Sequence, residues 1–167
     1  MPPPFHTSNR VVLVTGSSSG IGRETAVTFG RRQARVAVTY HTDRDGAAET
    51  ADRVREVGGE AIVVQYDMTD IESVDAAVGA VRDRWGAIDT LVNNAVLHDV
   101  GPTPFEDLSP AEWRRIVHGI TDGVAYTIRA ALPALRSSGT GRIVTVSSSA
   151  VEGSPGMAAY VTAKAGL

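Results

Sequence analysis

A tyrosine and a lysine four residues apart, Tyr160 and Lys164, are the side chains with the clearest chemical potential. On a helix, residues i and i+4 lie on one face, one turn apart, so the phenol and the ammonium would be neighbours. Lys164 is the only lysine among 16 basic residues, and all the others are arginine. A compact ammonium can stabilise a nearby phenolate, which a planar guanidinium does less well. The pair therefore predicts acid–base chemistry at Tyr160.

A second segment with chemical potential is the glycine-rich turn Thr15-Gly16-Ser17-Ser18-Ser19-Gly20-Ile21-Gly22. It follows a short apolar run and precedes a helical pattern. Glycines in that place let the backbone approach a pyrophosphate, and the helix N-terminus offers free N–H groups. The spacing is Gly-x3-Gly-x-Gly rather than the commoner Gly-x-Gly-x2-Gly. A flexible turn without a ligand is the alternative, but the strand–turn–helix context favours a dinucleotide.

The elements that must position these residues alternate along the chain. Short apolar runs rich in β-branched residues predict strands buried on both faces at residues 10–14, 36–39, 61–64, 88–92 and 143–146. Helical patterns lie between them at 22–30, 44–57, 70–85 and 109 to about 135, and again from about 158. This alternation predicts an α/β fold, a Rossmann-type doubly wound parallel sheet in the order 3-2-1-4-5. The glycine-rich turn should lie at the carboxyl end of its first strand.

Composition limits the class of protein. The chain has 167 residues, 43% hydrophobic and 21% charged, which is typical of one globular domain. We expect a flexible tail over residues 1–9 and a single domain over 10–167. The formal charge of -3 argues against nucleic acid as a partner. Without cysteine there is neither a disulfide framework nor a thiolate metal site, and no metal is predicted. With no signal peptide and no apolar run near the ~20 residues that span a bilayer, we expect a cytoplasmic protein without a membrane partner.

Four motifs together resemble the short-chain dehydrogenase/reductase family, and 3-oxoacyl carrier-protein reductases in particular. They occur in the order found in that family: the turn at 15–22, Asp67-Met68-Thr69-Asp70, Asn93-Asn94-Ala95-Val96, and Tyr160-Val161-Thr162-Ala163-Lys164. The resemblance covers nearly the whole chain after residue 9. It implies an NAD(P)(H)-dependent oxidoreductase that acts on a small-molecule carbonyl or secondary alcohol.

The resemblance also implies roles for individual residues. Tyr160 would be the general acid or base, Lys164 would hold the nicotinamide ribose, and a serine after the fifth strand would polarise the substrate oxygen. Ser148 matches that serine when counted from the strand, whereas counting back from Tyr160 gives Ser147. We choose Ser148, because register in a strand is fixed and a loop can lose a residue. The implied cofactor-binding residues are Gly16, Ser18, Ser19, Gly20, Ile21, Gly22, Asp67, Met68, Asn94, Ala95, Tyr160 and Lys164.

The choice between NAD and NADP depends on the end of the second strand. In the family, a carboxylate there binds the ribose 2′-hydroxyl and would repel a 2′-phosphate. The matching residue is Tyr40, so NADP(H) is favoured, with His41 or Arg44 to meet the phosphate. Two alternatives stay open: these are solvated loop residues, or Asp43 turns toward the ribose.

Two positions depart from the family pattern. Ile120 stands where an Asn normally holds a water that links the lysine to solvent, and Val96 replaces the glycine of Asn-Asn-Ala-Gly. Thr121 or Asp122 is a possible substitute for the Asn, and His118 is expected at the helix surface. Family members also continue for another ~80 to 100 residues, so we expect a fold that lacks the C-terminal strands, a bare fifth strand and no turnover by these 167 residues alone. A longer form should be a homo-oligomer. The alternative function is a non-catalytic dinucleotide-binding or sensing module.

Overall fold

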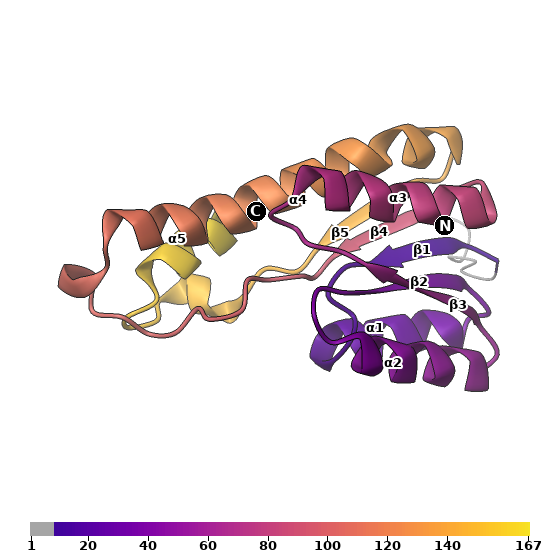
Figure 1. The fold of residues 1–167 in the computed structure, drawn as a ribbon, viewed down its shortest axis with the longest axis horizontal. Coiled ribbons are helices and arrows are strands. Elements are labelled where there is room, and N and C mark those ends of the chain that lie inside the picture. Colours follow the sequence, from indigo (N-terminus) through magenta and orange to yellow (C-terminus); the bar gives the residue numbers. More distant parts are fainter. Residues whose placement is uncertain (1–8) are drawn as a thin grey trace, which may run out of the picture.

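The computed structural model describes residues 9–167, so most of the expected tail, residues 1–8, lies outside the described part. Five parallel strands form one sheet in the order β3-β2-β1-β4-β5, which confirms the predicted order. The strands are β1 (Val11–Val14), β2 (Arg35–Tyr40), β3 (Glu60–Gln65), β4 (Thr90–Asn93) and β5 (Arg142–Thr145). Because β1 lies between β2 and β4, the chain reverses its winding direction there, as in a doubly wound fold (Figure 1).

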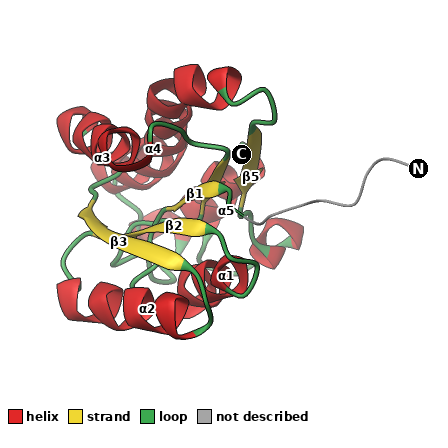
Figure 2. Ribbon diagram, turned by 90° about the vertical axis from the view of Figure 1, so that its right-hand side faces the viewer, coloured by secondary structure: helices red, strands yellow, loops and turns green. Residues whose placement is uncertain are grey.

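Helices cover both faces of the sheet. The first pair, α1 (Gly20–Gly30) and α2 (Arg44–Glu56), lies on one face, and α3 (Ile71–Trp85) and α4 (Pro110–Ser137) lie on the other (Figure 2). The last helix, α5 (Ala158–Ala165), packs against α4 beyond the carboxyl ends of the strands (Figure 1). Two short 3-10 turns, η1 (Phe105–Asp107) and η2 (Ser149–Glu152), complete the elements.

Local sequence explains where the helices begin and end. The carboxylates of Asp43 and Asp70 cap α2 and α3, and the Ser109 hydroxyl caps α4 by accepting the Glu112 amide. α3 ends at Gly86, whose φ of 74° is left-handed. α4 continues past Pro133 to Ser137, although the proline lacks the N–H that would bond to the carbonyl four residues earlier.

The sheet is buried between two apolar layers. One layer packs β1, β2 and β4 against α1 and α2, and the other packs them against α3 and α4. All four residues of β1 are fully buried, as predicted for a central strand. The same prediction was wrong for the outer strands: β3 is half-buried, and Ile143 and Val144 of β5 are 41% and 49% exposed. A strand at the edge has only one neighbour, so an apolar sequence does not ensure its burial.

Candidate functional site

A cleft of about 690 Å³ opens at the carboxyl ends of the strands and gathers segments far apart in the sequence. It is lined by the glycine-rich turn and by the loops that follow β2, β3, β4 and β5, and by α5. The predicted catalytic residues Ser148, Tyr160 and Lys164 all line it. So do the predicted cofactor residues Gly16, Ser18, Ser19, Ile21, Gly22, Asp67, Met68, Asn94 and Ala95.

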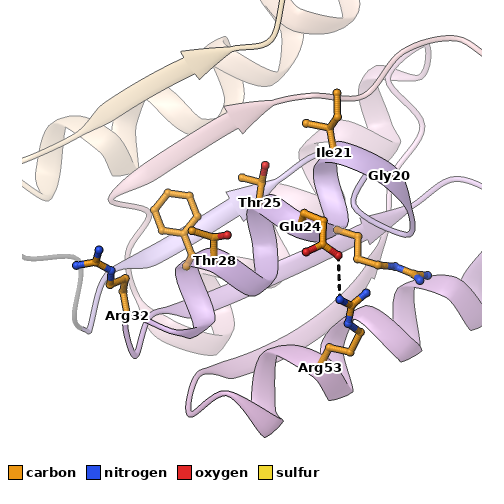
Figure 3. Close-up of a pocket in the computed structure, with 9 residues that line it drawn as sticks. Gly20, Ile21, Glu24, Thr25, Thr28, Arg32 and Arg53 are labelled. Carbon is orange, nitrogen blue, oxygen red and sulfur yellow. Dashed lines mark hydrogen bonds and ion pairs between the residues drawn. The ribbon is translucent and has the colours of Figure 1, made fainter.

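Gly20 is the predicted residue that does not line the cleft. It lines a larger groove of about 1010 Å³ on the outer side of α1, together with Ile21, Thr25 and Thr28 (Figure 3). None of the predicted catalytic residues borders this groove. The chemistry expected from the sequence therefore belongs to the smaller cleft.

The glycine-rich turn is packed so closely that side chains would not fit at two of its positions. A Cβ at Gly22 would lie 2.3 Å from the Gly16 carbonyl oxygen and 2.6 Å from Asn94 Nδ2. A Cβ at Gly16, whose φ is +62°, would lie 2.8 Å from Ala95 Cα. These glycines therefore allow the turn after β1 to pack against the loop after β4.

Buried hydroxyls hold this packing in place. Thr15 Oγ1 accepts hydrogen bonds from the Asn94 and Ala95 amides, both at 3.0 Å. The Gly16 amide donates to Thr39 Oγ1 at 2.9 Å, and the Thr39 amide donates to Ser17 Oγ at 2.9 Å. Sequence reasoning did not assign Thr15, Ser17 or Thr39 to the site, although Thr15 and Ser17 belong to the turn motif itself.

The turn can hold an anionic ligand through its backbone. Asn94 Nδ2 donates to the Thr15 and Gly16 carbonyl oxygens at 3.0 and 2.9 Å, so this side chain supports the turn. Within residues 9–167, the amides of Ile21 and Gly22 at the start of α1 have no acceptor. Unpaired amides at a helix N-terminus can donate hydrogen bonds to a dinucleotide pyrophosphate, and glycines without room for a Cβ let it approach them.

One end of the cleft is formed by His41 and Asp67. His41 Nε2 lies 3.2 Å from Asp67 Oδ2, and the other Asp67 oxygen accepts the amide and hydroxyl of Thr69 at 2.8 and 2.7 Å. Burial alone would raise the pKa of Asp67, but the bonds from Thr69 and the charge of His41 outweigh it and lower that pKa. Next to them, burial raises the pKa of Tyr66 to about 12, and its hydroxyl lies 2.6 Å from Thr127 Oγ1.

The other end of the cleft is formed by Tyr160 and Lys164, which lie on one face of α5 as predicted. Lys164 Nζ lies 5.9 Å from the centroid of the Tyr160 ring, a cation–π contact, and donates to the Val146 carbonyl at 2.9 Å. Lys164 is 4% exposed, and burial lowers the pKa of its ammonium below the usual value. One of its three N–H donors is therefore used by the protein, which leaves two for a ligand.

The two candidate serines differ in what their hydroxyls do. Ser147 Oγ donates its proton to the Lys164 carbonyl at 2.9 Å, which ties the loop after β5 to α5. Ser148 Oγ accepts the Ala150 amide at 3.2 Å and caps η2, so its own proton stays available to a substrate oxygen. Both serines line the cleft. The hydrogen bonding favours Ser148 as the donor to substrate.

The two departures from the family pattern have different surroundings. Ile120 is fully buried with Ile116, Ala159 and Ala163, so it supports the packing of α5 on α4. Its neighbour Thr121 is engaged within α4, since Thr121 Oγ1 donates to the Val117 carbonyl. Val96 is 39% exposed and lines the cleft, where its side chain takes space that a glycine would leave open.

The polar residues near Ile120 have partners on α4 itself. Asp122 Oδ2 lies 3.3 Å from His118 Nδ1, and this pair lies on the exposed surface of α4. His118 is therefore the helix-surface histidine that the sequence predicted. In the described part of the chain, neither Asp122 nor Thr121 lines the cleft.

The buried ammonium of Lys164 gives a pH prediction. Because its pKa is lower in the folded chain than the usual ~10.4, the unfolded chain binds the proton more tightly in the window between the two values. The free energy of unfolding contributed by Lys164 should therefore rise with pH across that window. We expect urea unfolding to show wild type gaining stability relative to Lys164→Met as the pH rises toward the usual lysine pKa. Parallel pH dependences of the two proteins would contradict it.

Similarity to known proteins extends over nearly the whole chain. The family model for "short chain dehydrogenase" matches residues 10–167. The cis-4-hydroxycyclohexanecarboxylate dehydrogenase of Sinomonas cyclohexanicum is 37% identical over 163 residues, which are 96% of this chain and 64% of that protein. Glucose 1-dehydrogenase 2 of Bacillus subtilis (strain 168) is 34% identical over 125 residues, 75% of this chain and 48% of that protein.

A solved structure gives the same result in three dimensions. The NADH-dependent reductase A1-R′, crystallised with NAD, superposes with a TM-score of 0.88 at 29% identity, covering 95% of this chain and 68% of that chain. The chain spans about half to two thirds of the length of the curated relatives it matches (48% and 64%).

Proposed function

The chain belongs to the short-chain dehydrogenase family, and on that premise we propose that it serves an NAD(P)(H)-dependent oxidoreductase of carbonyl and secondary alcohol substrates. One observation carries the proposal: a single cleft joins Ser148, Tyr160 and Lys164 to the glycine-rich turn. The turn leaves no room for a Cβ at Gly22 and presents free amides, as a pyrophosphate requires.

Each residue of the cleft has its own role in the proposed reaction. The bound cofactor supplies a hydride at its nicotinamide ring for transfer to the carbonyl carbon. Tyr160 donates its hydroxyl proton to the carbonyl oxygen, and Ser148 polarises that oxygen with a hydrogen bond. Lys164 would hold the nicotinamide ribose with its remaining N–H donors, while the Val146 carbonyl holds its ammonium in place. In the oxidation direction, Tyr160 accepts the proton of the alcohol.

Titration with NADPH and NADH, followed by nicotinamide fluorescence, tests the cofactor part of this proposal. A panel of ketones and aldehydes, with absorbance of the reduced cofactor as the readout, tests the reaction. Cofactor binding without consumption of NADPH across the panel would favour the second candidate function, a dinucleotide-binding module without catalysis. The buried Ile120 in place of a polar residue, with Thr121 bonded to Val117, is the observation that favours that alternative.

We further propose that the cofactor is NADP(H). No carboxylate from the end of β2 lines the cleft: Asp43 is turned to the Gly46 amide, which it accepts at 2.9 Å as the cap of α2. His41 lines the cleft at this end, whereas Arg44 does not. A 2′-phosphate bound here would meet the His41 imidazole, which lies 3.2 Å from Asp67 Oδ2.

His41→Asp is expected to shift the preference from NADPH toward NADH by at least about tenfold in the ratio of Kd values, or ~1.4 kcal/mol. The introduced carboxylate would repel the 2′-phosphate and could accept the 2′-hydroxyl of NADH. Fluorescence titration with both cofactors measures the ratio. Thr42→Asp is the control, because it adds the same charge one residue further on, where the side chain does not line the cleft. An equal shift in both variants would contradict the role of His41.

Self-association is also part of the proposal. Within residues 9–167, β5 lies at the edge of the sheet with one strand neighbour, and its apolar residues Ile143 and Val144 are 41% and 49% exposed. An unpaired apolar edge favours pairing with another chain. We expect concentration-dependent association in sedimentation velocity, which Val144→Lys should weaken. A monomer across the accessible concentration range would contradict this part.

A further inference from the structure

We propose that Arg23 is a positioning residue that holds the glycine-rich turn in the shape required to bind the dinucleotide. The inference rests on the proposed cofactor site and adds to it a residue that does not line the cleft. Arg23 lies in the first turn of α1, directly after Gly22.

The guanidinium of Arg23 connects the turn to α2 through four hydrogen bonds. Its Nη2 donates to the Ser18 carbonyl at 2.6 Å and to the Gly46 carbonyl at 3.2 Å. Its Nε donates to Thr50 Oγ1 and its Nη1 to Glu49 Oε1, both at 2.9 Å. The side chain is 18% exposed, so these bonds are largely shielded from water.

The bond to Ser18 controls the direction of the next amide. Because the peptide unit is planar, fixing the Ser18 carbonyl oxygen also fixes the N–H of Ser19, which points the opposite way. Both residues line the cleft, and within residues 9–167 the Ser19 amide has no acceptor. Arg23 thus orders a backbone donor for the ligand before the ligand arrives. Ordering in advance lowers the entropic cost of binding.

An arginine at this position would by itself destabilise α1. A cation in the first turn faces the positive end of the α1 dipole, which is unfavourable. Glu49 and the two carbonyl oxygens offset that cost only because the guanidinium reaches all of them at once. The arrangement therefore serves the contact between the turn and α2 rather than the stability of α1 itself.

A second ion pair between the same two helices provides a matched control. Arg53 of α2 donates to Glu24 of α1 at 2.9 Å, on the far side of the groove from Ile21 (Figure 3). This pair joins α1 to α2 as Arg23 does, but it has no bond to the glycine-rich turn. Removing Arg53 therefore tests helix–helix attachment alone.

The experiment compares Arg23→Met with Arg53→Met. The Kd values for NADPH and NADH are measured by fluorescence titration, and amide hydrogen exchange is followed at residues 17–22. For Arg23→Met we expect both cofactors to bind at least about tenfold more weakly, by similar factors, because both contain the pyrophosphate. Exchange at residues 17–22 should also be faster. For Arg53→Met we expect Kd values within about twofold of wild type and unchanged exchange in the turn.

Each other outcome counts against the inference or against the cofactor site separately. Wild-type affinity in Arg23→Met, or equal weakening in Arg53→Met, would overturn the positioning role. If wild type binds neither cofactor, the proposed function fails, and hydrogen exchange alone decides whether Arg23 orders the turn. If Arg23→Met does not fold, Arg23→Lys and Arg53→Lys carry the same comparison, because a lysine ammonium lacks the planar fork that spans Ser18, Glu49 and Thr50.

Discussion

Tyr160→Phe is expected to lower the rate of NADPH-dependent carbonyl reduction by about 10²–10⁴-fold, the usual contribution of a positioned general acid. Phe keeps the ring that contacts the Lys164 ammonium and removes only the hydroxyl. The Kd for NADPH should therefore stay close to that of wild type. The measurement is consumption of NADPH with a ketone substrate, made on the longest form of the protein that shows turnover.

Tyr126→Phe is the matched control for this experiment. Tyr126 is a half-buried tyrosine of α4 that contacts Arg129 and does not line the cleft. Its hydroxyl can be removed without touching the proposed chemistry, so turnover should not change. A Tyr160→Phe protein that reduced the substrate at the parent rate would rule out Tyr160 as the proton donor, whatever the control did.

Gly22→Ala is expected to weaken NADPH binding by at least about 100-fold, or ~2.7 kcal/mol. The added Cβ would lie 2.3 Å from the Gly16 carbonyl oxygen, 2.6 Å from Asn94 Nδ2 and 2.9 Å from Ser17 Cα. Two of these are backbone atoms of the turn, so the backbone itself must move to make room. Overpacking of this kind costs about 1–3 kcal/mol of stability as well. Fluorescence titration and urea unfolding measure the two effects.

Gly79→Ala separates the steric effect from that of any glycine replacement. Gly79 lies inside α3, and a Cβ there would meet no atom within 4 Å. Alanine in a helix interior is favoured over glycine by about 0.5–1 kcal/mol, so this variant should be slightly more stable and bind NADPH as wild type does. Unchanged cofactor binding in Gly22→Ala would show that the turn does not approach the pyrophosphate.

The sheet could be predicted from the sequence because burial acts on local patterns. β1 is a run of four apolar residues that are all fully buried between two layers, and such runs identify central strands. The same pattern in β5 predicted burial on both faces, whereas Ile143 and Val144 are exposed. The burial of a strand depends on its neighbours in the sheet, and these cannot be inferred from the sequence of the strand itself.

Some residues of the candidate site could also be predicted from the sequence, and others could not. Gly16, Gly22 and the Tyr160–Lys164 pair belong to short motifs, so the sequence identified them, and the structure shows that they line one cleft. Apart from the bond of Arg23 to Ser18, the contacts of Thr39 and Arg23 join residues 22 to 27 positions apart along the chain, such as Thr39 to Ser17 and Arg23 to Thr50. Such contacts arise only when β2 pairs with β1 and α2 packs beside the turn, so no local pattern predicts them.

The choice between Ser147 and Ser148 shows where motif counting fails. The two serines are adjacent and both line the cleft, so spacing from β5 and spacing from Tyr160 give different answers. Hydrogen bonding separates them, because Ser147 donates to the Lys164 carbonyl and Ser148 does not. Ile120 is a similar case: the sequence marks it as a departure, but only the packing with Ala159 and Ala163 explains why an apolar residue belongs there.

The burial of the single lysine makes the chain suitable for selective chemical labelling. Lys164 carries the only side-chain amine in the sequence; it lines the cleft and is 4% exposed. An amine-reactive reagent that modifies a side chain must therefore enter the cleft to do so. The extent of modification at this one residue, read by mass spectrometry, reports directly whether the cleft is open, filled by a ligand or lost on unfolding.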